Sequence, residues 1–428
     1  MSSTLVSGSF ASRGLAGYLQ RLAAGLVRAR LAALREGRLT VTEPGRAASF
    51  GLVADRAGLC ATVRVHDPRF WTAVAFGGSA GAGAAYMKGY WTTEDLTAVL
   101  RLMVRNRPVL EQIDAGLARL LAPFNRLGHW LRRNSVTGAR RNIEAHYDLG
   151  NDFFALMLDP TLMYSCALFE RADMTLEEAQ YAHLQRLCAK LRLSPDDHLL
   201  EIGTGWGGFA IHAAQHYGCR VTTTTISEQQ YACAHARIQA AGLGDRITLL
   251  QKDYRELDGQ FDKLVSIEMI EAVGDEFYDE YFARCARLLK DDGVMLLQAI
   301  TIADQRYEEA RRSVDFIQRF IFPGSTIPSV TAMLESMTRA SDLRLTHLED
   351  TGVHYVTTLS RWRRNLLRQL PEVMALGYSE SFVRLWEFYL CYCEAGFAER
   401  ALGDVQMLLA KPGNREEPVL GRLADDAQ

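Results

Sequence analysis

Apolar residues recur along the chain with two different periods. Between residues 14 and 37 they fall at helical spacing with arginines between them, which predicts a basic amphipathic helix. Residues 38–41, the segment ending at Phe50 and residues 61–65 are predicted strands, and Glu43-Pro44-Gly45 is predicted to form a turn. A basic stretch with nine arginines and two acids runs from residue 101 to 141. The apolar positions of the helix are Leu15, Tyr18, Leu19, Leu22, Leu26, Leu31 and Leu34.

Beyond Asn142 predicted strands and helices alternate, as in repeated βα units. We therefore predict an α/β fold with a doubly wound, mostly parallel Rossmann-like sheet, preceded by a smaller mixed α+β domain. The domains are predicted to span 1–141 and 142–428, and residues 308–320 and 381–401 are expected to form inserted helices. The predicted strands are 198–202, 219–226, 247–250, 263–267, 294–300, 343–348 and 404–409.

Composition agrees with two globular domains, because 428 residues are too many for one ordinary domain. The chain is 48% apolar and 23% charged, without an apolar run long enough to span a bilayer. No signal peptide is recognisable, and eight cysteines are too few for a disulfide scaffold. These features predict a cytoplasmic protein. The net charge of −3 argues against a nucleic-acid binder. His212 and His216 lie four apart without a third ligand, so we expect no metal site.

A glycine-rich loop follows the first predicted strand of the second domain. Gly203, Gly205 and Gly208 match G-x-G-x-x-G, which is by itself a weak signal for a dinucleotide, and a structural turn without ligand is a further alternative. Three features favour S-adenosylmethionine. Glu201 can organise the loop, the second strand ends in threonines without an acid for a nicotinamide ribose, and Asp253-Tyr254-Arg255 follows the third strand. The residues predicted to bind the cofactor are Glu201, Ile202, Gly203, Gly205, Trp206 and Gly207 of the loop, together with Ser227, Asp253 and Arg255.

Seven spaced motifs resemble one known family. The chain is similar to cyclopropane-fatty-acyl-phospholipid synthases and to the related mycolic acid cyclopropane synthases over most of its length. Residues 61–68 and 86–91 resemble the N-terminal domain of the members that act on phospholipids. The seven motifs are 142–152 (NIEAHYDLGND), 164–166 (YSC), 201–208, 225–230 (TISEQQ), 266–274 (SIEMIEAVG), 321–324 (IFPG) and 391–397 (CYCEAGF).

The resemblance implies methyl transfer from S-adenosylmethionine to the double bond of an unsaturated acyl chain. The resulting carbocation then loses a proton, and a bound bicarbonate ion is the base that the family implies. In the matching positions Cys166 contributes its backbone, Glu271 and Tyr355 hydrogen-bond the bicarbonate, and Ile300 completes the wall. Cys393 matches a cysteine that is sometimes given a catalytic role, although a structural role is favoured. The cofactor pocket implied by the family is formed by Tyr164, Ser165, Thr225, Ile226, Gln230, Tyr254 and Ile267.

Two departures from the family pattern concern the proton. Ala272 and Gln298 stand where many members have histidine, and an amide cannot titrate near neutral pH. Glu268, absent from the common pattern, is a candidate additional base. A ring-forming phospholipid synthase is the leading hypothesis, and a methyltransferase that leaves a methyl-branched alkene is the alternative. A small-molecule methyltransferase and a non-enzymatic lipid-binding module are the hypotheses from other classes.

The small net charge is the sum of two parts of the chain that have opposite net charges. Residues 1–141 carry 20 basic and 8 acidic side chains, whereas the remainder carries 28 and 43. A basic domain suits docking on anionic lipid headgroups, while attraction between the two domains is the alternative. We therefore expect a protein associated peripherally with the inner face of the membrane through the phospholipid bilayer. A homodimer is a further possibility.

Overall fold

The computed structural model describes residues 14–52, 58–108, 110, 150–417 and 419. These residues divide into two compact units. The N-terminal unit holds the described residues up to 110 together with Tyr378–Glu399, and the sheet unit holds 150–377 and the described residues from Arg400 onward. The predicted domain boundary at 141 lies outside the described residues and stays a prediction. The helix predicted over 381–401 belongs to the N-terminal unit by its contacts, although the sequence grouped it with the second domain.

The N-terminal unit combines a four-stranded sheet with four helices among its described residues. The sheet order is β2-β1-β3-β4, with β1 and β2 forming an antiparallel hairpin and β1 and β3 lying parallel. The mixed α+β prediction is therefore confirmed for this part. Its elements are α1 (Leu15–Leu31), β1 (Arg38–Glu43), β2 (Arg46–Gly51), β3 (Cys60–Val65), α2 (Arg69–Met87), β4 (Trp91–Thr93), α3 (Leu96–Arg105) and α17 (Glu380–Ala398).

Polar contacts join α17 to the earlier helices of this unit. The Tyr86 hydroxyl on α2 donates to Glu387 at 2.8 Å, and Thr97 on α3 donates to Glu394 at 3.2 Å. Arg101 and Arg105 both pair with Glu399, at 2.6 and 2.7 Å. Residues almost 300 positions apart are thus paired within one unit, which local sequence patterns do not reveal.

The sheet unit contains a seven-stranded sheet in the order β10-β11-β9-β8-β5-β6-β7. The five strands β9, β8, β5, β6 and β7 run parallel to one another, and β11 runs antiparallel to both β9 and β10. The doubly wound, mostly parallel sheet is therefore confirmed. Its strands are β5 (His198–Ile202), β6 (Arg220–Thr224), β7 (Ile247–Leu250), β8 (Phe261–Ile267), β9 (Leu289–Ile302), β10 (Arg344–Asp350) and β11 (Leu402–Ala410).

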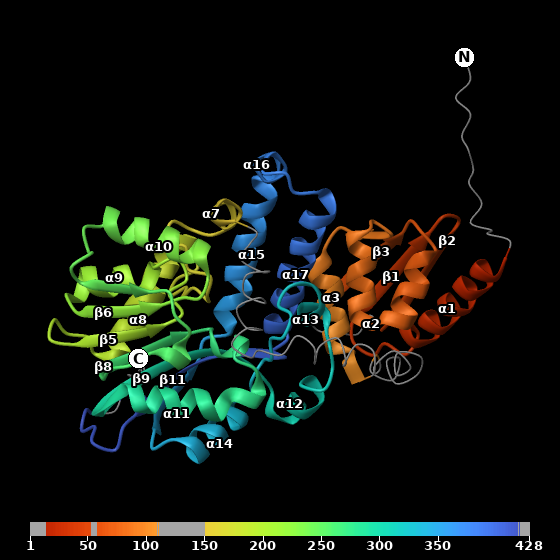
Figure 1. Ribbon diagram of the computed structural model, residues 1–428. Helices are drawn as coiled ribbons and strands as arrows, with labels where there is room; N and C mark the ends of the chain where they lie inside the picture. The colour runs from red at the N-terminus through yellow and green to blue at the C-terminus, as the bar shows by residue number, and fades with distance from the viewer. Residues whose placement is uncertain (1–13, 53–57, 109, 111–149, 418, 420–428) are drawn as a thin grey trace, which may run out of the picture. The chain divides into compact units, whose positions relative to one another are not determined.

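Helices cover both faces of this sheet (Figure 1). Leu199, Val265 and Leu296 belong to a core cluster shared with α8 (Leu176–Leu191), α9 (Gly208–Tyr217) and α10 (Glu228–Ala240). The neighbouring Leu200 and Leu264 point to the opposite core, shared with α11 (Tyr278–Leu288) and α14 (Val330–Ala340). Successive strand side chains alternate between faces, so strands that are apolar at every position are buried on both.

The remaining helices are short, except for the 16-residue helix α15 (Val353–Arg368). They are α7 (Asn151–Met157), α12 (Asp304–Ala310), α13 (Phe316–Phe320), α15 (Val353–Arg368) and α16 (Leu370–Ala375), with 3-10 turns η2 (Tyr254–Glu256), η3 (Ile270–Ala272) and η4 (Asp275–Phe277). The single helix predicted over 308–320 is wrong. Two helices form instead, because Asp315 caps a new one by accepting from the Gln318 N–H at 2.9 Å. No helix among the described residues is long and apolar enough to cross a membrane.

Candidate active site

The glycine loop turns sharply out of β5 and into α9. Gly203, Gly205 and Gly207 all have positive φ, at 102°, 53° and 86°, which favours glycine. A Cβ on Gly205 would project into open space, whereas one on Gly208 would lie 2.7 Å from the carbonyl oxygen of Thr161. The loop thus leaves an open cradle at the carboxyl end of β5, the usual ligand-binding edge of a doubly wound sheet.

Glu201 stabilises this loop from inside the sheet. The Thr223 hydroxyl on β6 donates to Glu201 Oε2 at 2.6 Å, and the hydroxyls of Thr223 and Thr204 are also 2.6 Å apart. Burial, opposed by the Thr223 hydrogen bond, raises the pKa of Glu201 to about 8. The predicted role in organising the loop agrees with these contacts, while contact with the amino group of a cofactor stays a prediction.

The second and third strands end in polar turns at the same sheet edge. Thr225 donates to the Gln230 side chain at 2.9 Å, and Ser227 caps α10 by accepting from the Gln230 N–H at 3.3 Å. Asp253 forms an ion pair with Arg255 of its own turn at 2.8 Å. Tyr254 is buried, and its hydroxyl has no hydrogen-bond partner among the described residues. Ile226 and Ile267, half-buried, also lie at strand ends on this edge.

Glu268 lies directly after β8 in a backbone conformation that is unusual for a glutamate, with φ of 49°. Its Oε1 accepts from the Ser165 hydroxyl at 2.6 Å and from the Cys166 N–H at 3.0 Å. It also accepts from the Gln298 amide at 3.0 Å, while Oε2 accepts from the Tyr355 hydroxyl. Four donors therefore converge on one carboxylate. Burial nevertheless raises its pKa.

Gln298, fully buried on β9, uses both ends of its amide. Its Nε2 donates to Glu268 and to Asp404 Oδ2, 2.9 Å away, and lies 3.1 Å from the Ser165 hydroxyl oxygen. Its Oε1 accepts from His183 Nε2 at 2.8 Å and from Gln406 at 3.0 Å. Because the amide oxygen can only accept, His183 donates here through Nε2. The amide that stands at the position of the family's histidine is thus fully engaged by protein groups.

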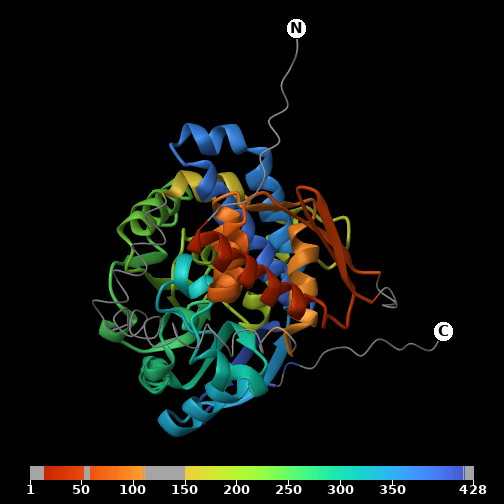
Figure 2. The ribbon, with the colours of Figure 1, turned by 90° about the vertical axis from the view of Figure 1, so that its right-hand side faces the viewer.

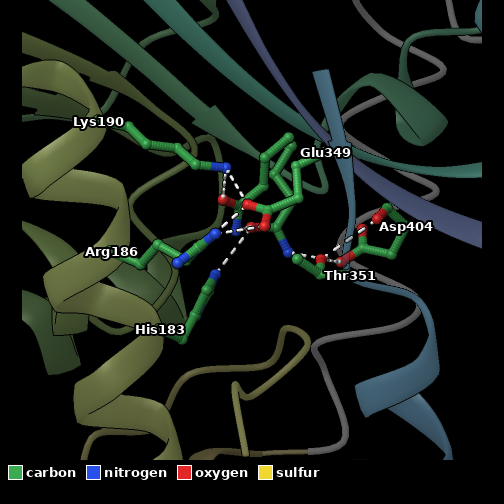
Figure 3. A network of polar contacts seen from close by, with 8 residues as sticks. His183, Arg186, Lys190, Glu349, Thr351 and Asp404 are labelled. Atoms are coloured by element: carbon green, nitrogen blue, oxygen red, sulfur yellow. Dashed lines mark hydrogen bonds and ion pairs between the residues drawn. The ribbon is translucent and has the colours of Figure 1, made fainter. Parts of the chain in front are cut away.

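Asp404 and Thr351 extend the network toward the sheet edge (Figure 3). The Thr351 hydroxyl lies 3.0 Å from Asp404 Oδ2, and Asp404 Oδ1 is buried without a hydrogen-bond partner among the described residues. Burial, with the charge of Glu268, raises the pKa of Asp404 well above its usual range. This shift disfavours the ionised form of Asp404, because a second charge there would lie near another buried acid.

A second branch leads from Gln406 to partly exposed charges. Lys190, buried on α8, donates to Gln406 at 2.7 Å and to Glu349 at 2.6 Å. Arg186 also pairs with Glu349, and Figure 3 shows these side chains converging from α8 and β10. Although burial acts in the opposite direction, the hydrogen bonds from Arg186 and Lys190 lower the pKa of Glu349 to about 2. This cluster ties α8 to the antiparallel edge of the sheet.

Glu271 is the second carboxylate at the end of β8. Its Oε1 accepts from the Ile300 backbone N–H at 2.5 Å, and its Oε2 is buried without a partner among the described residues. Burial and the charge of Glu268 raise its pKa to about 8. A buried, unpartnered carboxylate oxygen is poised to accept a hydrogen bond or a proton from a ligand.

Aromatic rings lie beside these carboxylates and beside the glycine loop. The rings of Tyr164 and Tyr355 lie 5.1 and 6.1 Å from that of Trp362. Phe154 on α7 contacts both Tyr164, at 5.5 Å, and Trp206 of the loop, at 4.9 Å. These ring contacts form a continuous aromatic cluster from the glycine loop to Tyr355, whose hydroxyl donates to Glu268.

The structure brings most of the predicted catalytic residues together. Cys166, Glu268, Gln298 and Tyr355 share one hydrogen-bond network, and Glu271 contacts Ile300. Cys393 lies on α17 in the N-terminal unit, and its catalytic role stays a prediction. Sequence reasoning missed the other network members, which are His183, Arg186, Lys190, Glu349, Thr351, Asp404 and Gln406. The polar positions 404 and 406 in an otherwise apolar strand were the available signal, since β11 pairs Gln406 with Gln298 in register.

Comparison with known proteins agrees with this geometry. Residues 134–407 match the family model of mycolic acid cyclopropane synthetase. The tuberculostearic acid methyltransferase UfaA1 of Mycobacterium tuberculosis is 38% identical over 78% of this chain and 80% of its own. The cyclopropane-fatty-acyl-phospholipid synthase of Escherichia coli is 37% identical over 81% of this chain and 86% of its own.

Solved structures give the same result. The cyclopropane synthase MmaA2 of Mycobacterium tuberculosis matches with a TM-score of 0.60 and 33% identity, over 64% of this chain and 98% of that one. The mycolic acid cyclopropane synthase CmaA1, complexed with SAH and CTAB, matches with the same TM-score, 34% identity and the same two coverages.

The fold and the site together define an S-adenosylmethionine-dependent methyltransferase of the cyclopropane synthase type. The chain belongs to the mycolic acid cyclopropane synthetase family. The residues present fit S-adenosylmethionine as methyl donor, because the Gly205 cradle is open and an unpartnered Glu271 oxygen lies at the end of the neighbouring strand β8.

Proposed function

We propose that this enzyme adds the methyl carbon of S-adenosylmethionine to the cis double bond of an unsaturated phospholipid acyl chain, and that loss of a proton then closes a cyclopropane ring. The observation that carries the proposal is the pair of half-buried carboxylates, Glu268 and Glu271, beside the glycine loop and the aromatic rings. The relatedness to the Escherichia coli phospholipid synthase supports the choice of substrate.

Bound S-adenosylmethionine supplies an electrophilic methyl group, and the chain supplies position and charge. An alkene is a weak nucleophile, so it must be held in line with the methyl carbon in a dry site. Its π electron pair forms the new C–C bond, while the C–S bond breaks and leaves its pair on sulfur. The positive charge that remains on the acyl chain is stabilised by the carboxylate of Glu268 and by the ring of Tyr355.

In this proposal a carboxylate accepts the proton that the carbocation loses. Bicarbonate, expected from the family resemblance, would need the Cys166 N–H, the Tyr355 hydroxyl and the Gln298 position, and all three engage Glu268 instead. The donor set therefore does not fit a second anion in this arrangement. We assign the role of base to Glu268, which takes a proton from the new methyl group as the C–H pair forms the ring bond.

A methyl-branched alkene is the second candidate product, and the Glu268–Gln298 contact favours it. A carboxylate that is fixed by four hydrogen bonds cannot move with the substrate as a free ion could. The product therefore depends on which carbon lies nearest to this carboxylate, the new methyl group or a neighbouring carbon of the chain. Loss of a proton from a neighbouring chain carbon would leave a branched alkene of the same mass. The relative named as a tuberculostearic acid methyltransferase is compatible with this outcome.

We also propose that the enzyme works on the cytoplasmic face of a membrane as a peripheral protein. The basic excess of residues 1–141 supports this, since anionic headgroups attract arginine-rich surfaces.

Product analysis tests both candidates. The purified enzyme is incubated with S-adenosylmethionine and vesicles of a monounsaturated phospholipid, and the recovered acyl chains are derivatised at remaining double bonds. A product one CH₂ heavier that resists derivatisation supports the ring, whereas a derivatised product of that mass identifies the branched alkene. Methylation of soluble acceptors with none on lipid would contradict the proposed function.

A further inference from the structure

Helix α1 packs on the N-terminal unit mostly through small residues and exposes five large apolar ones. Its buried positions are Gly17, Ala23, Ala24, Val27 and Leu31, and its neighbour is α2 (Figure 2). Five large apolar residues of the same helix are exposed, namely Leu15 (77%), Tyr18 (54%), Leu19 (43%), Leu22 (48%) and Leu26 (51%).

The five exposed residues form one continuous face. Their spacings of three and four place them on the same side of a helix along most of its 17 residues. Helices of globular proteins ordinarily turn their largest apolar residues toward the core, and contiguous exposed apolar surface marks an interaction site. Packing within the unit therefore does not account for these leucines.

The charge around this face identifies its partner. Residues 14–35 carry four arginines and no acid, and Arg21 and Arg35 are exposed. Arg28 pairs with Glu43 at 2.6 Å and lies over the Trp71 ring, so it holds the helix to its unit. The cationic side chains of the helix complement an anionic lipid surface, whereas two copies of this helix would bring like charges together.

We infer that α1 is an interfacial membrane anchor, which lies in the headgroup region of an anionic bilayer with Leu15, Tyr18, Leu19, Leu22 and Leu26 inserted among the acyl chains. The inference rests on the proposed function in one respect, namely that the substrate is carried by a bilayer. It names the segment that brings the enzyme to that substrate and the lipid charge that the segment requires.

Vesicle binding by the full chain tests the inference. Cosedimentation with vesicles of phosphatidylcholine and phosphatidylglycerol is compared with vesicles of phosphatidylcholine alone. We expect binding that needs the anionic lipid and weakens with salt. The double substitution Leu22→Gln and Leu26→Gln should lower the partition coefficient by roughly tenfold or more. The matched control is Leu345→Gln with Leu348→Gln, at exposed leucines of the sheet unit, which should bind like the wild type.

The remaining outcomes separate the two proposals. A folded α1 variant, with an unchanged thermal midpoint, should lose activity on vesicles but keep it on detergent-dispersed phospholipid. Wild-type binding by that variant, or binding that ignores lipid charge, would overturn the inference. A variant that changes only the oligomer mass in sedimentation equilibrium would show that this face joins copies of the chain. If vesicle binding depends on α1 but no lipid is methylated, the proposed function is wrong and the inference about α1 stands.

Discussion

The side-chain amide of Gln298 donates to the carboxylate of Glu268, with 3.0 Å between Nε2 and Oε1. An amide neither accepts nor releases a proton near neutral pH, so it fixes this carboxylate without competing for the proton. At the position where the family resemblance leads one to expect a histidine, this chain instead has a rigid donor. In the proposed mechanism, proton transfer is consequently assigned to an acidic side chain.

Replacing Glu268 with Gln should lower turnover on monounsaturated phospholipid by about 10² or more, because a positioned base contributes on that scale. Binding of S-adenosylmethionine, measured by calorimetry, should change little. Glu335→Gln, at an exposed position on α14, is the matched control. Turnover equal to that of the wild type in a folded Glu268→Gln enzyme would refute the assigned role.

Removing the amide of Gln298 should destabilise the sheet unit. Gln298→Leu leaves Asp404 and the donors of His183 and Gln406 without their partner, and a buried polar group left unpaired costs about 1–3 kcal/mol. We expect the free energy of unfolding in urea to fall by about 2–5 kcal/mol. Gln239→Leu, at an exposed position on α10, should change it by less than about 0.5 kcal/mol. Equal effects of the two substitutions would contradict the network.

The raised pKa of Glu271 predicts a pH-dependent stability. A carboxyl with a pKa of about 8 in the folded state and an ordinary value when unfolded binds more protons in the folded state. The contribution of Glu271 to the free energy of unfolding is complete below the unfolded pKa of 4.5. It is lost as the pH rises toward 8, and the free energy of unfolding then falls by at most about 1.4 kcal/mol per pH unit. Urea unfolding from pH 5 to 8 measures this slope, and Glu271→Gln should reduce it. Glu201, with a similar pKa, should leave a residual slope.

The glycine at the start of α9 should be intolerant of a side chain. A Cβ at Gly208 would lie 2.7 Å from the Thr161 carbonyl oxygen and 2.9 Å from the Met163 sulfur, so the loop must shift. Gly208→Ala is therefore expected to weaken S-adenosylmethionine binding by about tenfold, as measured by calorimetry. Gly25→Ala, where nothing lies within 4 Å, is the control. An unchanged affinity in Gly208→Ala would show that the loop does not need this close packing.

Local patterns predicted much of the fold because each depends on near neighbours in the chain. The alternating and continuous apolar runs located every strand of the seven-stranded sheet, and the glycine loop was found because its turn requires positive φ at Gly203 and Gly205. The insertion between β9 and β10 was predicted less well, since the cap at Asp315 interrupts a helical pattern. The outward face of α1 was not predictable, because the same apolar spacing fits a buried or an exposed stripe.

The sequence by itself determined the fold class, the methyl donor and the two carboxylates at the end of β8, because these follow from periodicity and from motifs of adjacent residues. Only the tertiary structure decided what holds Glu268. Its donors lie 103, 30 and 87 positions away in the chain, at Ser165, Gln298 and Tyr355. The pairing of β9 with β11 brings Asp404 and Gln406 to the same amide. A hydrogen bond depends on distances of about 3 Å between atoms, and distances between remote segments are fixed only when the sheet has formed.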